Sequence, residues 1–217
     1  MPRDRRATAA ARAEPVRIET VRDLRRSQIV AAARSIVAGA GMDALTIAAL
    51  EARLGVTRGV ITYHFHDQDE IERAVLESVV AEIDASLRGA LEEARSHEDA
   101  LRTIVRANVR GFVDRPEAGR VLLSFWSRIG SDERIRALNA KLYATYRRGT
   151  RRLLEAAARD GAFAGADLDA VATAVVGVVL GIATQWYFDP EAIDVDASID
   201  AACDAVVALS RVRAKRG

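Results

Sequence analysis

Apolar residues recur with a period near 3.6 along almost the whole chain, and this feature restricts its fold more than any other. The clearest run steps by four along one helical face and comprises Ile71, Val75, Val79, Ile83, Leu87 and Leu91. No segment sustains the apolar–polar alternation that is typical of a half-buried strand. We therefore expect an all-α protein, and a hydrophobic content of 50% over 217 residues is enough to form a substantial core.

Residues that cap helices and residues that break them divide this pattern into about nine helices. The expected helices lie near residues 24–39, 46–53, 57–65, 67–91, 101–113, 121–129, 135–160, 167–188 and 198–211. The first three form an N-terminal unit, and the others are numerous and long enough for a larger helical bundle.

Charge is unevenly distributed, although the formal net charge is only +1. The first 26 residues hold eight arginines against four acidic residues. We interpret residues 1–21 as a basic, disordered arm. Such an arm could lie along phosphates, or it could simply be a solvated tail.

Cys203 is the only cysteine, so an intrachain disulfide is impossible and a reducing interior is the natural setting. Residues 1–13 lack the apolar core of a signal peptide. We therefore expect a cytoplasmic protein.

The segment AVATAVVGVVLGIATQWYF, residues 170–188, is apolar and about long enough to span a bilayer. Its flanks carry Asp167, Asp169 and Asp189 instead of the Lys/Arg clusters that anchor membrane helices. A helix buried in a soluble bundle or in a subunit interface accounts for the same sequence. We expect a helix buried in a soluble bundle or in a subunit interface, with no membrane contact.

The segment LGVTRGVITYHF, residues 54–65, differs from its surroundings because it is rich in β-branched residues, aromatic residues and glycine. Gly55 can adopt the positive φ of a tight turn after a short helix, and Thr57 is a suitable N-cap for the next one. Two short helices joined by a glycine turn have the layout of a helix-turn-helix. The second helix of that motif enters the major groove of DNA, and its packing face must be compact and apolar. That packing requirement overrides the weak strand propensity.

Polar residues on and beside this second helix are the candidate DNA contacts. Arg58 near the helix start can offer a two-pronged hydrogen bond to guanine, and Gly59 lets the backbone approach closely. Thr46 and Thr57 can bind phosphate through hydroxyl and backbone N–H groups. For any one of these residues alone, ordinary helix surface or core is the favoured interpretation, whereas the set at this spacing indicates DNA binding. The predicted DNA-binding residues are Thr46, Thr57, Arg58, Gly59, Thr62, Tyr63 and His64.

Residues 25–71, RRSQIVAAARSIVAGAGMDALTIAALEARLGVTRGVITYHFHDQDEI, resemble the N-terminal domain of the TetR family of one-component transcriptional regulators. The matching features are the helix that ends at Gly41, Thr46 at the start of the second helix, Gly55-Val56-Thr57, Gly59 and the His64-Phe65 pair. Residues 121–154 are similar, more weakly, to the subgroup whose best-known member represses choline-to-betaine genes. The resemblance implies a helix-turn-helix DNA-binding domain over residues 22–67 and a ligand-binding and dimerisation domain over residues 68–217.

Three residues depart from the family pattern. Glu51 stands where a small residue usually packs between the motif helices, so we expect it to tilt outward or to pair with a nearby arginine. Gln68 replaces a frequent phosphate-contacting lysine, which should weaken DNA affinity and reduce the slope of its salt dependence by about one. Thr62 replaces a frequent tyrosine.

The resemblance further implies a homodimer that binds a palindromic operator, since two-fold proteins suit palindromic sites. Its dimer interface would be a four-helix bundle made from residues 167–188 and 198–211 of both copies. Gly177 and Gly181 would permit close backbone approach there. A core helix inside one subunit would look similar.

A small-molecule effector should bind among the fifth to eighth helices, where most of the few aromatic residues fall. Aromatic walls suit an apolar ligand or a cationic ligand, the latter through cation–π attraction of ~0.5–2 kcal/mol. The candidate ligand-binding residues are Phe112, Phe125, Trp126, Tyr143, Tyr146 and Trp186. The competing interpretation is that these rings are only core packing.

Two other classes of protein, an enzyme and a protein-interaction module, have weaker support in the sequence than a regulator. Catalysis is not indicated, because His64 and His66 do not share a helical face for a metal, Cys203 has no histidine nearby in the sequence, and no glycine-rich phosphate loop is present. We therefore expect no catalytic residues, no metal and no cofactor. A helical protein-interaction module without DNA binding is the alternative, although it would not require Arg58, Gly59 and the threonine caps. Among regulators, we expect a repressor rather than an activator.

Overall fold

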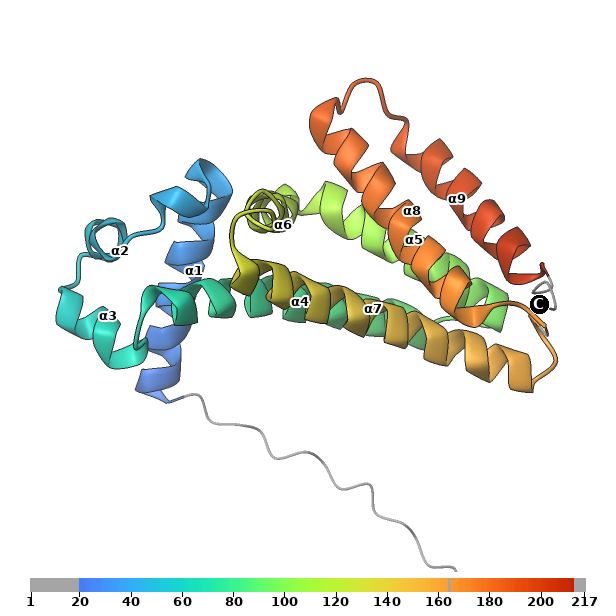
Figure 1. The fold of residues 1–217 in the computed structure, drawn as a ribbon, viewed down its shortest axis with the longest axis horizontal. Coiled ribbons are helices and arrows are strands. Elements are labelled where there is room, and N and C mark those ends of the chain that lie inside the picture. The colour runs from blue at the N-terminus through green and yellow to red at the C-terminus, as the bar shows by residue number, and fades with distance from the viewer. Residues whose placement is uncertain (1–19, 164, 213–217) are drawn as a thin grey trace, which may run out of the picture.

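The computed structural model describes residues 20–163 and 165–212. Within these ranges the protein is all-helical, with nine α-helices, one short 3-10 helix and no strand, so the predicted fold class is confirmed. Figure 1 shows a small group of helices, α1 to α3, at one end and a longer bundle extending from it. The helices are α1 Val21–Ala40, η1 Met42–Ala44, α2 Ile47–Leu54, α3 Arg58–His64, α4 Gln68–Glu92, α5 His97–Asp114, α6 Pro116–Trp126, α7 Glu133–Arg159, α8 Leu168–Phe188 and α9 Val195–Ser210. Residues 1–19 of the expected basic arm lie outside the described part of the chain.

Local capping explains where these helices begin and end. Thr20 and Asp23 form a reciprocal capping box at the start of α1, and Gly41 ends that helix at φ +81°. Asp194 accepts a hydrogen bond from the Ala197 N–H, so α9 starts three residues before the expected residue 198. Helix α6 also begins earlier than expected, because Pro116 is well suited to a first helical position.

The N-terminal helices pack around a small apolar core. Ile29, Leu50, Ile61 and Phe65 are each at most 2% exposed, and they hold α1, α2 and α3 together. Gly55 ends α2 in the left-handed conformation at φ +64°, which confirms the expected glycine turn. The seven residues of α3 are therefore helical despite their strand propensity, because a buried apolar side supports them.

Helix α5 lies at the centre of the larger bundle. It packs against α4, α7, α8 and α9, while α1 packs against both α4 and α6. The N-terminal helices are therefore attached to the bundle through α4 and α6. The expected boundary at residue 67 falls between α3 and α4, and the division into two domains stays a prediction.

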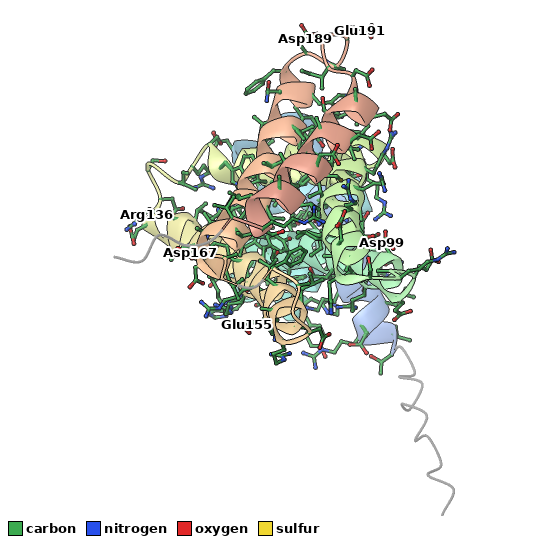
Figure 2. All side chains as sticks on the ribbon, turned by 90° about the vertical axis from the view of Figure 1, so that its right-hand side faces the viewer. Asp99, Arg136, Glu155, Asp167, Asp189 and Glu191 are labelled. Carbon is green, nitrogen blue, oxygen red and sulfur yellow. The ribbon has the colours of Figure 1, made fainter. Side chains whose placement is uncertain are left out.

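Helix α8 is long and apolar enough to cross a membrane by length and composition. It packs against α5, α7 and α9, yet only 28% of its most apolar window is buried within this one chain. Figure 2 views the molecule from the end where α8 and α9 lie side by side, with Asp167, Asp189 and Glu191 at the ends of this pair. The pair thus leaves small and apolar residues uncovered within this chain, among them Gly177 and Phe188 of α8 and Ala205 and Leu209 of α9.

Candidate nucleic-acid interface and ligand cavity

Helix α3 presents a polar face to solvent and an apolar face to the core. Arg58, Gly59, Thr62 and Tyr63 are exposed, and Tyr63 retains 69% of its accessible surface. Ile61 on the opposite face is fully buried. Figure 1 places α3 at the extremity of the molecule, so this face is accessible to a large partner.

The hydroxyl groups of the predicted DNA contacts differ in what they already bind. The Thr46 hydroxyl accepts a hydrogen bond from the Ala49 N–H at 3.1 Å and so caps α2. The Thr62 hydroxyl donates to the Arg58 carbonyl at 3.1 Å. Thr57 occupies the N-cap position of α3, but its side chain forms no capping hydrogen bond there. Its hydroxyl is accordingly available to an external group.

Arginines of α1 surround the end of α3, a feature that the sequence did not predict. Arg26 donates to the His64 carbonyl, forms an ion pair with Glu70 at 2.9 Å and lies 4.0 Å above the centre of the Phe65 ring. Arg22 lies over the exposed ring of Tyr63 at 5.4 Å. These contacts fix the C-terminal end of α3 between α1 and α4 and add positive charge beside the polar face.

His64 is partly buried at the end of α3. Burial lowers the pKa of His64 below 6.5, and the positive charges of Arg22, Arg26 and Arg25 lower it further. Its Nδ1 atom is buried and has no hydrogen-bond partner among the described residues. The imidazole is therefore held in its neutral form near neutral pH.

The structure shows the surroundings of two residues that depart from the family pattern, Glu51 and Gln68. Glu51 is partly exposed and forms no ion pair within the described residues, which agrees with an outward tilt. Gln68 is turned along α4, where its amide donates to Glu72 at 3.3 Å. The Gln68 side chain therefore makes an internal contact at this position.

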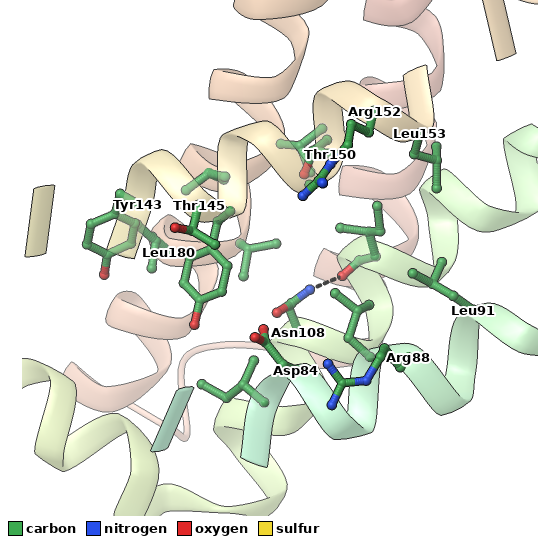
Figure 3. A pocket seen from close by; sticks show the side chains of 18 of the residues that line it. Asp84, Arg88, Leu91, Asn108, Tyr143, Thr145, Thr150, Arg152, Leu153 and Leu180 are labelled. Carbon is green, nitrogen blue, oxygen red and sulfur yellow. Dashed lines mark hydrogen bonds between the residues drawn. The ribbon is translucent and has the colours of Figure 1, made fainter. Parts of the chain in front are cut away.

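A cavity of about 330 Å³ lies among α4, α5, α7 and α8 (Figure 3). Most of its wall is apolar and includes Leu87, Leu91, Ile104, Leu122, Leu153, Val175, Val179 and Leu180. Polar atoms come from Asp84, Arg88, Asn108, Tyr143, Tyr146 and Arg152, among others. A partly open, mainly apolar cavity with a few polar groups is typical of a small-molecule site.

The structure separates the candidate ligand-binding aromatics into two groups. Phe112, Tyr143 and Tyr146 line the cavity. Trp126 lies behind it with its ring centre 6.2 Å from that of Tyr143, and Phe125 is fully buried in the core. Trp186 packs against Tyr187 and is not part of this wall. Aromatic composition alone cannot distinguish a cavity wall from core packing.

The charged lining residues were not predicted from the sequence. Asp84 stands in α4 among apolar residues at helical spacing, after Val80 and before Leu87 and Leu91, and this interruption of the stripe was the available signal. Burial raises the pKa of Asp84, and the positive charge of Arg88 opposes that rise. Burial also raises the pKa of both Tyr143 and Tyr146. The Tyr146 hydroxyl is buried and has no hydrogen-bond partner among the described residues.

A network of charged residues joins the first turns of α4 to the turn between α6 and α7. Glu72 in α4 is only 2% exposed, and its carboxylate contacts Arg134 at 2.8 Å and Arg128 at 3.5 Å. Arg134 also pairs with Asp69 and Asp132. The helix that follows α3 is thus tied directly to the part of the bundle that leads into the cavity-lining α7.

Comparison with known proteins connects these sites to a family. The family model described as "Bacterial regulatory proteins, tetR family" matches residues 29–75, and the one described as "BetI-type transcriptional repressor, C-terminal" matches residues 97–211. The HTH-type transcriptional regulator BetI of Vibrio parahaemolyticus is 22% identical over 180 residues, which cover 80% of this chain and 86% of that protein. BetI of Burkholderia cenocepacia is 24% identical over 119 residues, 54% of this chain and 61% of that protein.

Solved structures show the same fold at low sequence identity. A transcriptional regulator from Pseudomonas aeruginosa PAO1 superposes with a TM-score of 0.75 at 22% identity and covers 91% of each chain. A regulator from Saccharomonospora viridis, solved in complex with choline, gives 0.72 at 20% identity over 83% of this chain and 94% of that one. The regulator FadR from Bacillus subtilis, in complex with stearoyl-CoA, gives 0.74 at 16% identity over 84% and 98%.

The two family models cover residues 29–75 and 97–211, and the C-terminal one alone spans more than half of the chain. The exposed polar face of α3 and the cavity residues on α5, α7 and α8 fall within these matched segments, whereas the cavity residues on α4, between positions 83 and 91, lie in the gap between them. The predicted resemblance is therefore confirmed, and the chain belongs to the TetR family of bacterial transcriptional regulators.

Proposed function

We propose that the protein is a ligand-responsive repressor that binds a palindromic operator as a homodimer. The observation that carries this proposal is the face of α3, where Arg58, Thr62 and Tyr63 reach solvent above a buried apolar side. A short helix of this kind suits the major groove, and Arg58 near its start can form a two-pronged contact with guanine. Thr57 and Thr46 lie at the starts of α3 and α2, where phosphate contacts are favourable.

The uncovered face of α8 and α9 supports a homodimer. Gly177 is exposed and nothing lies within 4 Å of the position its Cβ would occupy, so a second helix could approach closely. A dimer would present two α3 helices to half-sites about 34 Å apart, or a multiple of that spacing. One short helix alone would bind weakly.

The cavity supports an effector role for a small ligand, either apolar or cationic. Its wall includes α4, and α4 directly follows the helix-turn-helix. The Saccharomonospora relative binds choline and the Bacillus FadR binds stearoyl-CoA, which are respectively a small cation and a long-chain acyl compound. A ligand that favours one arrangement of α4 over another shifts the population of DNA-binding dimers, and such coupling typically amounts to ~1–3 kcal/mol.

A cytoplasmic location is part of the same proposal. A protein that binds chromosomal DNA works in the cytoplasm of a bacterium, and the single cysteine, Cys203, is buried as a free thiol. Both points agree with a reducing compartment.

The test is a gel-shift titration with the DNA upstream of the protein's own gene. Wild type, Arg58→Ala and Arg136→Ala are compared, because Arg136 is an exposed arginine in the first turn of α7 whose loss removes the same charge. We expect Arg58→Ala to weaken specific binding by about tenfold or more, since a good base contact is worth about 1–3 kcal/mol. Arg136→Ala should stay within about twofold of wild type.

Two results would contradict the proposal. Failure of wild type to shift any palindrome in that DNA, even at low salt, would favour a helical protein-interaction module. Equal binding by wild type and Arg58→Ala would show that α3 does not read the bases.

A further inference from the structure

Two polar groups that face the cavity have no hydrogen-bond partner among the described residues. The hydroxyl of Tyr146 is buried and forms no hydrogen bond there. Asp84 forms no hydrogen bond or ion pair there either, and Figure 3 shows its carboxylate directed from α4 toward the interior of the cavity. Polar groups in such places cost free energy unless a ligand or water satisfies them.

The charge pattern around the cavity distinguishes its inner part from its surface. Asp84 is partly buried and lies near enough to Tyr146 for its charge to raise the pKa of that phenol. Arg88, one turn further along α4, and Arg152 on α7 also line the cavity, but both are exposed to solvent. The negative charge of Asp84 is therefore less hydrated than either positive charge, and Arg88 compensates it only in part.

The remaining wall is apolar on nearly every side. Leu87, Leu91, Leu153, Val175 and Val179 form it together with other aliphatic side chains, and the ring of Phe112 adds an aromatic surface. A volume of about 330 Å³ is within the range of pockets that hold small organic molecules. The space suits a ligand that is mostly hydrocarbon and carries one polar end.

We propose that this cavity binds a protonated primary or secondary amine that bears an apolar chain, with its ammonium group at Asp84. This inference rests on the proposed function, because it names the chemical class of the effector. The ammonium N–H groups donate to the Asp84 carboxylate and to the Tyr146 hydroxyl, while the chain lies along the leucine and valine side chains of α4, α7 and α8. Alkylamines have pKa values near that of lysine, about 10.4, so they are charged at neutral pH.

The hydrogen-bonding requirement separates this class from two similar ones. A fully alkylated ammonium ion carries the same charge and attracts aromatic rings, but it has no N–H group to satisfy the carboxylate and the Tyr146 hydroxyl. A fatty carboxylate would place a second negative charge in the cavity and would have to rely on the exposed Arg88 and Arg152. Charge-assisted hydrogen bonds to a desolvated carboxylate favour the amine over both.

Isothermal titration calorimetry tests the proposal with three probes that share one chain: n-octylamine, octyltrimethylammonium and octanoate. We expect n-octylamine to bind wild type about tenfold tighter than octyltrimethylammonium, and octanoate to bind more weakly than either. Asp84→Asn should weaken n-octylamine binding by about tenfold or more, and Tyr146→Phe by a smaller factor. Glu77→Gln is the matched control, because it removes one negative charge from an exposed site on the same helix, and it should leave affinity unchanged.

Each alternative outcome overturns the proposal in a distinct way. Equal binding of octylamine and octyltrimethylammonium would assign recognition to the aromatic rings alone. Tighter binding of octanoate would assign it to Arg88 and Arg152, and absence of binding by all three would remove the amine site. The calorimetry contains no DNA, so a protein that shifts its operator but binds no amine disproves only this inference. A protein that binds octylamine but no DNA disproves the proposed function instead.

Discussion

At the scale of single residues, Gly119 and Tyr187 join α6 to α8 in a way that leaves no room for a side chain. The Tyr187 hydroxyl donates to the Phe112 carbonyl at 3.0 Å or to the Pro116 carbonyl at 3.2 Å, and the ring lies directly over Gly119. A Cβ on Gly119 would lie 1.8 Å from that hydroxyl oxygen. Burial raises the pKa of Tyr187 to about 12, so the phenol remains a hydrogen-bond donor at any ordinary pH.

Gly119→Ala should therefore lower the midpoint of thermal unfolding, because either the Tyr187 ring or α6 must move. Gly89→Ala is the control, since Gly89 lies in α4 and nothing is within 4 Å of its Cβ position. There the higher helix propensity of alanine should stabilise the protein by up to about 1 kcal/mol. Thermal unfolding followed by circular dichroism gives the midpoint for each variant. Shifts of the same sign in the two midpoints would disprove the packing argument.

The lowered pKa of His64 predicts how the stability of the folded protein depends on pH. Its pKa is lowered by burial and by neighbouring arginines, so the unfolded chain binds a proton more readily than the folded one. Stability should therefore fall as the pH drops below about 6.5, and this contribution should stop changing below the folded-state pKa. An NMR titration of the His64 ring should give a pKa below 6.5 that rises in Arg22→Gln. A pKa at or above 6.5 in wild type would contradict the proposed causes.

At the scale of elements, ion pairs between helices differ greatly in how much water they exclude. Arg102, Arg106 and Arg110 on α5 pair with Asp204, Asp200 and Asp196 on α9, a ladder that runs along the surface. Glu72 on α4, by contrast, is buried against Arg128 and Arg134. Exposed pairs contribute little because water and salt screen them, whereas removing one partner of a buried pair leaves a charge without compensation.

Glu72→Gln should lower the free energy of unfolding by about 1–3 kcal/mol, which is less than for a wholly buried pair because both arginines keep some exposure. Asp200→Asn, which removes a carboxylate from the surface ladder, should change it by no more than about 0.5 kcal/mol. Urea unfolding at low and high salt measures both effects. Equal decreases in the free energy of unfolding of the two variants would show that burial of Glu72 does not increase the effect of removing its charge.

The expected and observed helix bounds show which helices the sequence predicted. The periodic apolar stripes and the caps at Thr46, Asp67 and Asp167 placed most helices, because these signals are local. The starts of α5, α6 and α9 were missed, since the first turns of α5 and α6 show no apolar stripe and α9 opens with one apolar residue, Val195, followed by Asp196 and Ala197. The ion pairs of Glu72 were missed because they depend on which helices meet, and a single sequence does not show this. Asp84 interrupts an apolar run, but the sequence does not show that this run borders a cavity.

At the scale of the whole molecule, the proposed DNA-binding face, the proposed effector cavity and the uncovered face of α8 and α9 lie in different parts of the all-helical structure (Figure 1). Family resemblance correctly predicted the all-helical fold with an N-terminal helix-turn-helix, because the motif around Gly55 and Thr57 is specific. The choice of cavity residues among the aromatics could not be made in the same way. A ring packed in the core and a ring beside a space have the same sequence pattern.

The proposed dimer predicts that a charge placed on the exposed face of α8 changes the mass of the protein in solution. Gly177→Glu adds a charge to the exposed face of α8 without a contact inside its own chain, and Gly89→Glu makes the same change on α4. Light scattering should give wild type and Gly89→Glu about 47 kDa, twice the chain mass of 23.5 kDa. Gly177→Glu should elute near the mass of a single chain, because a dimer interface would have to bury the new carboxylate. An unchanged dimer in Gly177→Glu would place the interface elsewhere.

Hydroxyl-radical footprinting of the upstream DNA shows whether a symmetric pair of α3 helices reads an operator. We expect two protected half-sites related by a two-fold axis, with centres about one helical turn apart or a multiple of it. Arg58→Ala should lose this protection at protein concentrations that saturate wild type. A single unpaired footprint, or protection that Arg58→Ala preserves in full, would contradict operator recognition by paired α3 helices.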